Sequence, residues 1–201
     1  LHRGTMTIKR ASPNAANDVN SAVQRVYDLG ARTDLKRQAM VSLLVHVMKE
    51  PFFTQLRTRE QLGYLVSARY GLARNRLLLI LSIQSQVKDP LFVSDRLNAF
   101  LDTFRPQSLG DIKFQQAKES LATKWTEPDT SMHHEAHRFW SEIENPQTDG
   151  APHFDRPYDI AKHVRNIDLA EIGQVYDSLK TDRARVLEVQ VFGKDPVLLE
   201  D

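Results

Sequence analysis

The sequence contains no cysteine among its 201 residues. A chain without thiols can form no disulfide framework and offers no thiolate ligands, so a disulfide-stapled scaffold and a cysteine-based zinc site are both excluded. The absence also agrees with a reducing compartment, and we expect a cytoplasmic location.

Long apolar runs and an excess of charge are missing as well. No run approaches the roughly 20 apolar residues of a membrane-spanning helix, and no signal-like apolar core follows Leu1. Lysine and arginine total 27 against 26 aspartate and glutamate residues, which leaves no basic field for a nucleic acid or a membrane surface. We therefore expect neither partner. Because no initiator methionine precedes Leu1, we expect the chain to be part of a longer polypeptide.

What the sequence does contain is the apolar patterning of one domain spanning residues 1–201. Residues 1–20 are expected to be poorly structured or, at Thr5–Lys9, to form a short edge strand. Further strands are predicted at residues 22–29, 62–70, 76–84 and 186–192. Helices are predicted to begin near Thr33, Asp89, Ser108, Ser131, Pro157 and Asp168, mostly at capping residues.

The order of these elements indicates the fold class. Early strands, a block of helices and a returning strand lack the steady alternation of a doubly wound fold. We predict an α+β fold: a two-layer sandwich of an antiparallel or mixed sheet with helices packed mainly on one face.

Local patterns give more detailed expectations. Pro51 is expected to end the helix that follows Thr33, because proline breaks a helix interior. Phe52, Phe53 and Trp140 are expected in the core. The last strand alternates two sets of side chains, and we expect the apolar set to face the core: Leu187, Val189 and Val191 against Glu188 and Gln190.

The stretch EPFFTQLRTREQLGYLV, residues 50–66, joins a helix to a strand through a dense polar segment. Arg57 and Gln61 lie within this segment, and Gly63 and Tyr64 close it. Residue types alone favour a well-capped surface corner. A binding site at this joint is the alternative.

The string MHHEAH is the first candidate for a metal site, with His133, His134, Glu135 and His137. His133 and His137 are four apart and could chelate a metal weakly, but the spacing fits neither H-E-x-x-H nor H-x-x-E-H. No third ligand is evident nearby, so we predict a solvated helix face and no metal site. Nucleophile elbows and phosphate-binding glycine loops are absent too, so the chain by itself lacks a catalytic centre.

Arg69, Arg74 and Arg76 surround the turn between two predicted strands. They could face a nucleic acid or an acidic partner, but Tyr70 is the one stacking aromatic beside them. Solvated loop charges are the better interpretation. His46 is expected to be an ordinary surface or boundary histidine.

The string LRTREQLGYLV behind EPFF resembles a segment in the C-terminal half of the insulin-degrading enzyme and pitrilysin family of inverted-zincin metallopeptidases. Collinear matches strengthen the resemblance, and together they make residues 20–193 look like the fourth domain of that family: IQS at 83–85, FLDTF at 100–104, FWSEI at 139–143 and FDR at 154–156.

The resemblance implies a full-length zinc metalloendopeptidase whose N-terminal half binds Zn²⁺ through an H-x-x-E-H helix. This chain would then be a domain of the other half that closes the peptide-degrading chamber, inactive and without a metal when alone. Its implied partners are peptide substrates and other domains of the same polypeptide, with a possible homodimer of the full-length enzyme.

The resemblance also implies roles for single residues. Arg57 would bind a backbone carbonyl of the peptide, since its rigid fork offers several donors. Tyr64 would be catalytic as well as substrate-binding, donating its phenol hydrogen bond to the developing oxyanion. Glu60, Gln61 and Gly63 would support the joint. The turn GLARN departs from the family pattern, which leaves substrate contacts there without support.

Two other functions stay open at this point. One is a structural, catalytically inactive member of the same superfamily, such as a core subunit of a respiratory complex. The other is a stand-alone peptide-binding module. The presence of both Arg57 and Tyr64 favours the peptidase.

Overall fold

A computed structural model describes residues 4–12, 17–145, 151–181 and 184–193 of the chain. Its elements in chain order are β1 (Gly4–Ala11), β2 (Ser21–Ala31), α1 (Leu35–Phe53), a π-helix (Thr54–Arg59), β3 (Leu65–Ala73), β4 (Arg76–Ser85), α2 (Pro90–Thr103), α3 (Asp111–Trp125), α4 (Met132–Glu144), α5 (Arg156–Asn166), α6 (Leu169–Asp177) and β5 (Arg185–Phe192). Short 3₁₀ turns, Pro106–Leu109 and Ser178–Lys180, precede α3 and follow α6.

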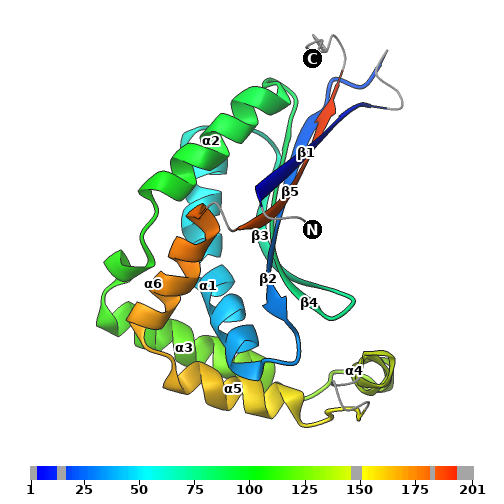
Figure 1. The fold of residues 1–201 in the computed structure, drawn as a ribbon, viewed down its shortest axis with the longest axis vertical. Coiled ribbons are helices and arrows are strands. Elements are labelled where there is room, and N and C mark those ends of the chain that lie inside the picture. Colours follow the sequence, from blue (N-terminus) through cyan, green and yellow to red (C-terminus); the bar gives the residue numbers. More distant parts are fainter. Residues whose placement is uncertain (1–3, 13–16, 146–150, 182–183, 194–201) are drawn as a thin grey trace.

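The five strands form one mixed sheet in the order β1-β5-β2-β4-β3. β1 runs parallel to β5, and the other neighbours are antiparallel. Figure 1 shows α1, α2, α3, α5 and α6 on one side of this sheet, and no helix of the described residues packs on its other side, which we call the bare side. The predicted α+β sandwich is confirmed, including the edge strand near Thr5–Lys9. In the described part of the chain, no helix is long and apolar enough to cross a membrane.

Helix α1 lies at the centre of the molecule, where it contacts β3 as well as α3, α5 and α6. Its buried apolar side chains lie almost all round the helix: Ala39, Val41, Leu43, Leu44, Val45, Val47, Met48 and Phe52. Asp34, not Thr33, caps the helix, because its carboxylate accepts from Arg37 N at 2.8 Å.

Pro51 does not end α1, and this expectation was wrong. The helix continues to Phe53 and then widens into the π-helix, with Thr54 N donating to both Glu50 O and Pro51 O. Proline removes one helical hydrogen bond at a cost of about 3 kcal/mol. Complete burial of Phe52 just before the π-helix and of Leu56 within it offsets that cost.

The start of α3 also differs from its prediction. This helix was expected to begin near Ser108, but the Ser108 hydroxyl donates to Arg105 O inside the 3₁₀ turn. Gly110, at φ +76°, then precedes the helix. The predicted caps of α2 and α6 are confirmed, with Asp89 accepting from Phe92 N and Asp168 forming a capping box with Glu171.

Strand β5 turns the opposite set of side chains to the helices from the one expected. Val186, Glu188, Gln190 and Phe192 face the helical layer, whereas Leu187, Val189 and Val191 face the bare side. Glu188 is buried because the Arg25 guanidinium on β2 pairs with its carboxylate, and Ser94 of α2 donates to it at 2.7 Å. A buried ion pair therefore overrides the apolar alternation.

Helix α4 stands apart from the helical layer, as its end-on coil beyond the β3–β4 turn shows in Figure 1. Trp140 was expected in the core but is 57% exposed, and the other large apolar side chains of α4 are exposed with it: Met132, Phe139 and Ile143. The buried residue of this helix is Glu142, held between Arg32 and Arg156. Charge pairing at one end thus fixes α4. Phe139 contacts the Phe154 ring at 5.4 Å, but most of the apolar face is exposed among the residues that the structure describes.

Candidate functional site

In the joint between α1 and β3, the α-helix continues directly into the π-helix Thr54–Arg59. The π-helix is closed by Glu60 N donating to Gln55 O at 3.0 Å, and Leu62 N then donates to Leu56 O at 3.0 Å. Leu56 and Leu62 are buried, so both ends of the turn are anchored in the core. Gln61 adopts φ +53°, the left-handed conformation that reverses the chain direction.

Glu60 locks this turn against α2. Its carboxylate accepts two hydrogen bonds from the Arg96 guanidinium, at 2.7 and 2.8 Å, and a third from Gln55 Nε2 at 2.7 Å. The hydrogen bonds from Arg96 are the main cause that lowers the pKa of Glu60 below its ordinary value. The polar residues of the joint therefore hold one geometry, as expected of supports.

Arg57 and Tyr64 lie side by side on the outside of this turn. Arg57 Nη1 donates to Tyr64 O at 2.7 Å, and its guanidinium carbon lies 4.9 Å from the Tyr64 ring centroid. The same carbon lies 5.1 Å from the ring centroid of Phe53, so two aromatic rings flank the cation. Tyr64 is 74% exposed, and Arg57 is half-buried. Both side chains thus belong to one accessible surface and neither is in the core.

Phe53 is the residue of this site that sequence reasoning misplaced. It was expected in the core, but it is 41% exposed, while Phe52 is fully buried. A signal was present in the sequence: Phe53 and Arg57 are four residues apart, the spacing at which helical side chains meet.

The histidine string and the arginines of the β3–β4 turn are not brought together with Arg57 and Tyr64. The His133 and His137 rings stack at 6.5 Å on the exposed face of α4. In the part of the chain that the structure describes, no three histidine, aspartate or glutamate side chains are grouped to hold a metal. Arg76 pairs with Asp28 at 2.7 Å, while Arg69 and Arg74 are exposed.

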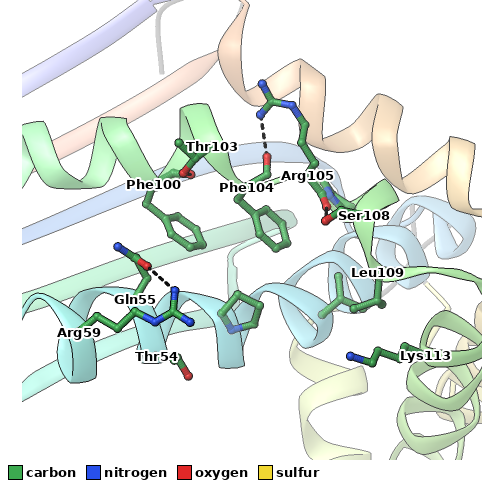
Figure 2. Close-up of a pocket in the computed structure, with 13 residues that line it drawn as sticks. Thr54, Gln55, Arg59, Phe100, Thr103, Phe104, Arg105, Ser108, Leu109 and Lys113 are labelled. Carbon is green, nitrogen blue, oxygen red and sulfur yellow. Dashed lines mark hydrogen bonds between the residues drawn. The ribbon is translucent and has the colours of Figure 1, made fainter.

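Two hollows flank the joint. The smaller, about 370 Å³, lies between the π-helix and the end of α2, where Figure 2 shows Phe100 and Phe104 above Gln55 and Arg59. The larger, about 870 Å³, lies on the other side between α1, β3 and α3, and Phe53 forms part of its wall. The larger hollow therefore adjoins the Arg57–Tyr64 surface.

Comparison with known proteins agrees with this structure. The family model described as PQQ synthase PqqF-like, C-terminal lobe domain 4, matches residues 43–140. Insulin-degrading enzyme of Drosophila melanogaster is 30% identical over 178 residues, which cover 86% of this chain and 17% of that protein. The crystal structure of pitrilysin superposes with a TM-score of 0.83 at 21% identity, covering 99% of this chain and 21% of that one.

The chain is a C-terminal domain of the insulin-degrading enzyme and pitrilysin family. A nardilysin-like protein of Arabidopsis thaliana is 24% identical over 204 residues, covering 98% of this chain and 20% of that protein. The chain thus spans about a fifth or less of the length of these relatives. The region that the family model matches, residues 43–140, runs from α1 to α4. It therefore includes the whole joint that carries Arg57 and Tyr64.

Proposed function

We propose that this chain serves as the C-terminal, non-zinc-binding domain of a longer zinc metalloendopeptidase. It closes the peptide-degrading chamber of that enzyme and offers Arg57 and Tyr64 to the bound peptide. The single observation that carries the proposal is the pairing of these two side chains on one accessible surface, at a joint held by Glu60. The names of the relatives support it, since they include insulin-degrading enzymes and a putative zinc protease.

The chemistry of the two side chains suits this role. One Arg57 nitrogen is used by Tyr64 O, and the guanidinium has further N–H donors for a peptide carbonyl. The Tyr64 phenol is a single neutral donor on a rigid backbone, which suits an oxygen that becomes negative in the transition state. Arg57 would thus orient the peptide, and Tyr64 would donate a hydrogen bond to the oxyanion.

Zinc would belong to another part of the longer polypeptide. The described residues of this chain offer no group of three ligands, and the His133–His137 pair lies on an exposed helix face far in sequence from the joint. When bound there, Zn²⁺ supplies a polarised water or carbonyl for hydrolysis. This chain alone would then be inactive.

Neighbouring domains of the same polypeptide are the partners that the surface of α4 fits. Its apolar side chains are exposed by 36% to 85%: Met132, Phe139, Trp140 and Ile143. Such a row on one helix is typical of a contact surface. Because the chain spans a fifth or less of the length of these relatives, we propose that other domains of the same longer polypeptide cover this face of α4. We further propose that the longer enzyme is cytoplasmic and can dimerise.

The test of this function is Tyr64→Phe in the longer polypeptide that carries this chain, assayed on a fluorogenic peptide. Loss of one oxyanion donor should lower kcat by about 10²- to 10³-fold and leave KM nearly unchanged. Arg57→Ala should instead alter KM as well as kcat, because it orients the substrate.

Tyr158→Phe is the matched control, since Tyr158 is 58% exposed on α5, a helix that is not part of the joint. It should leave turnover unchanged. Unchanged turnover in Tyr64→Phe would overturn the oxyanion role. A longer polypeptide that hydrolyses no peptide would support the structural, inactive alternative instead.

A further inference from the structure

The larger hollow beside the joint, which we call the α1–β3–α3 pocket, has a volume of about 870 Å³. Its lining comes from three elements: Ser42, Val45, His46, Lys49, Glu50 and Phe53 of α1, Val66 to Tyr70 of β3, and Leu121, Lys124 and Trp125 of α3. A hollow of this size accepts one or two amino-acid side chains.

The pocket is continuous with the Arg57–Tyr64 surface. The Phe53 ring contacts the Arg57 guanidinium and also lines the pocket. Val66, two residues after Tyr64, lines it as well, and residues of a strand advance by only about 3.3 Å each. A peptide held at Arg57 and Tyr64 therefore reaches the pocket within a few residues.

The floor of the pocket is apolar and aromatic. Val45, Val66 and Leu121 are buried there, and Trp125 lies edge-on to Tyr70 with ring centroids 6.4 Å apart. The buried Trp125 Nε1 has no hydrogen-bond partner among the described residues. Such a floor suits an apolar or aromatic side chain, which would bury its surface against the two aromatic rings.

The rim of the pocket is cationic. Lys49, Lys124 and Arg69 are exposed on it, and in the described part of the chain none of them forms an ion pair. Glu50 is the opposing carboxylate. Burial, together with Lys124 and Lys49, lowers the pKa of His46 below its ordinary value, so this histidine is neutral at pH 7. Three cations against one anion attract a carboxylate.

We propose that the α1–β3–α3 pocket is a subsite that takes an apolar or aromatic residue of a bound peptide together with a carboxylate next to it. The side chain lies on the floor against Trp125 and Tyr70. The carboxylate meets Lys49, Lys124 and Arg69. This inference rests on the proposed function only for its location beside the peptide, because the pocket binds without any reaction.

Peptide binding to the chain itself tests the subsite. The probes are Ala-Ala-Ala-Phe-Glu-Ala, acetylated and amidated, its Gln analogue, and Ala-Ala-Ala-Ala-Phe with a free C-terminal carboxylate, each followed by calorimetric titration. We expect the Glu probe, the free-carboxylate probe or both to bind about fivefold more tightly than the Gln probe, since exposed charge contacts with the rim cations are gained. The comparison between the first and third probes distinguishes a side-chain carboxylate from a terminal one.

Variants show whether the rim and the floor carry this preference. Lys49→Gln with Lys124→Gln should remove the fivefold preference, while Lys113→Gln, an exposed lysine on the same α3, should keep it. Replacing Phe by Ala in the probe should weaken binding further. Three results would each overturn the subsite. They are equal binding of the three probes, an unchanged preference in the double variant, and no binding at 1 mM peptide, which corresponds to a binding free energy weaker than about 4 kcal/mol.

Failure of this subsite is distinguishable from failure of the proposed function. Tyr64→Phe should keep the preference for the carboxylate probes, whatever it does to turnover. The Lys49→Gln, Lys124→Gln variant can also lose the preference for the carboxylate probes while the longer polypeptide still hydrolyses a neutral peptide at the normal rate. That result would show that the pocket binds peptide but takes no part in the reaction.

Discussion

The Gly63 backbone passes so close to the end of β4 that a Cβ atom at this position would lie 1.8 Å from Gln84 O. No rotamer relieves that overlap, because the opposing atom is backbone. Gly63→Ala must therefore displace either the joint or the end of β4, and we expect a loss of about 2–4 kcal/mol in the free energy of unfolding. Urea denaturation of the isolated chain measures it.

Gly71→Ala is the control for this prediction. Its added Cβ would meet Ile80 Cδ1 at 2.7 Å, and the end of a flexible side chain can move away. The loss should be below about 1 kcal/mol, because alanine is also better suited than glycine to a strand. Similar losses at both glycines would show that the close approach at Gly63 is not rigid.

Single residues were predictable from the sequence where their effect is local. Asp89 and Asp168 cap helices as their side chains dictate, since the partner N–H is three residues away. Apolarity alone could not place Phe53, because its neighbour Phe52 is equally apolar. Only the helix rotation decides which of the two is buried, and the four-residue spacing to Arg57 was the one signal for it. Glu60 as a support came from the family resemblance, but its partner Arg96 is 36 residues away and no pattern links them.

At the scale of elements, α4 shows how charge can decide packing. Glu142 lies between the buried guanidinium groups of Arg32 and Arg156, and Arg156 Nε donates to it at 3.0 Å. Glu142→Gln keeps the shape but leaves two buried cations without an anion. We expect the free energy of unfolding to fall by about 3–5 kcal/mol, with faster proteolysis within α4.

The matched control is Glu144→Gln on the same helix. Glu144 is exposed and accepts a hydrogen bond from Trp140 Nε1 at 2.7 Å, which a glutamine oxygen can also accept. It should change stability by less than about 0.5 kcal/mol. Equal effects of the two substitutions would mean that the buried charges around Arg32 are neutralised in some other way.

The positions of most strands and helices followed from apolar patterning, but the orientation of β5 and α4 did not. In both elements a buried ion pair faces the core and apolar side chains face outward. Patterning assumes that the apolar side is the inner side. That assumption fails where the partners of a charge come from distant strands and helices, here 163 and 110 residues away.

At the scale of the whole molecule, one core connects the sheet with α1, α2, α3, α5 and α6. The sequence predicted a single domain over residues 1–201, and this prediction calls for one cooperative unfolding transition. Calorimetry should give equal calorimetric and van't Hoff enthalpies, with a heat-capacity increase of about 2.5 kcal/mol per kelvin. Trp125 fluorescence in a Trp140→Phe variant should report the same midpoint as far-UV circular dichroism.

Two resolved transitions would contradict that prediction and divide the chain into separate folding units.

The pocket beside the joint could not have been predicted from the sequence. It forms where α1, β3 and α3 meet, and residues such as Val45 and Leu121 come together only after the helices have packed.

The arginine between two aromatic rings has an entropic consequence. A free arginine side chain loses up to ~2 kcal/mol of rotational freedom when it is fixed. Arg57 has already lost much of it on folding, through the stack with Phe53 and Tyr64 and the hydrogen bond to Tyr64 O. A carbonyl oxygen that reaches this guanidinium meets a donor that needs little further ordering, so most of the hydrogen-bond energy remains available as affinity.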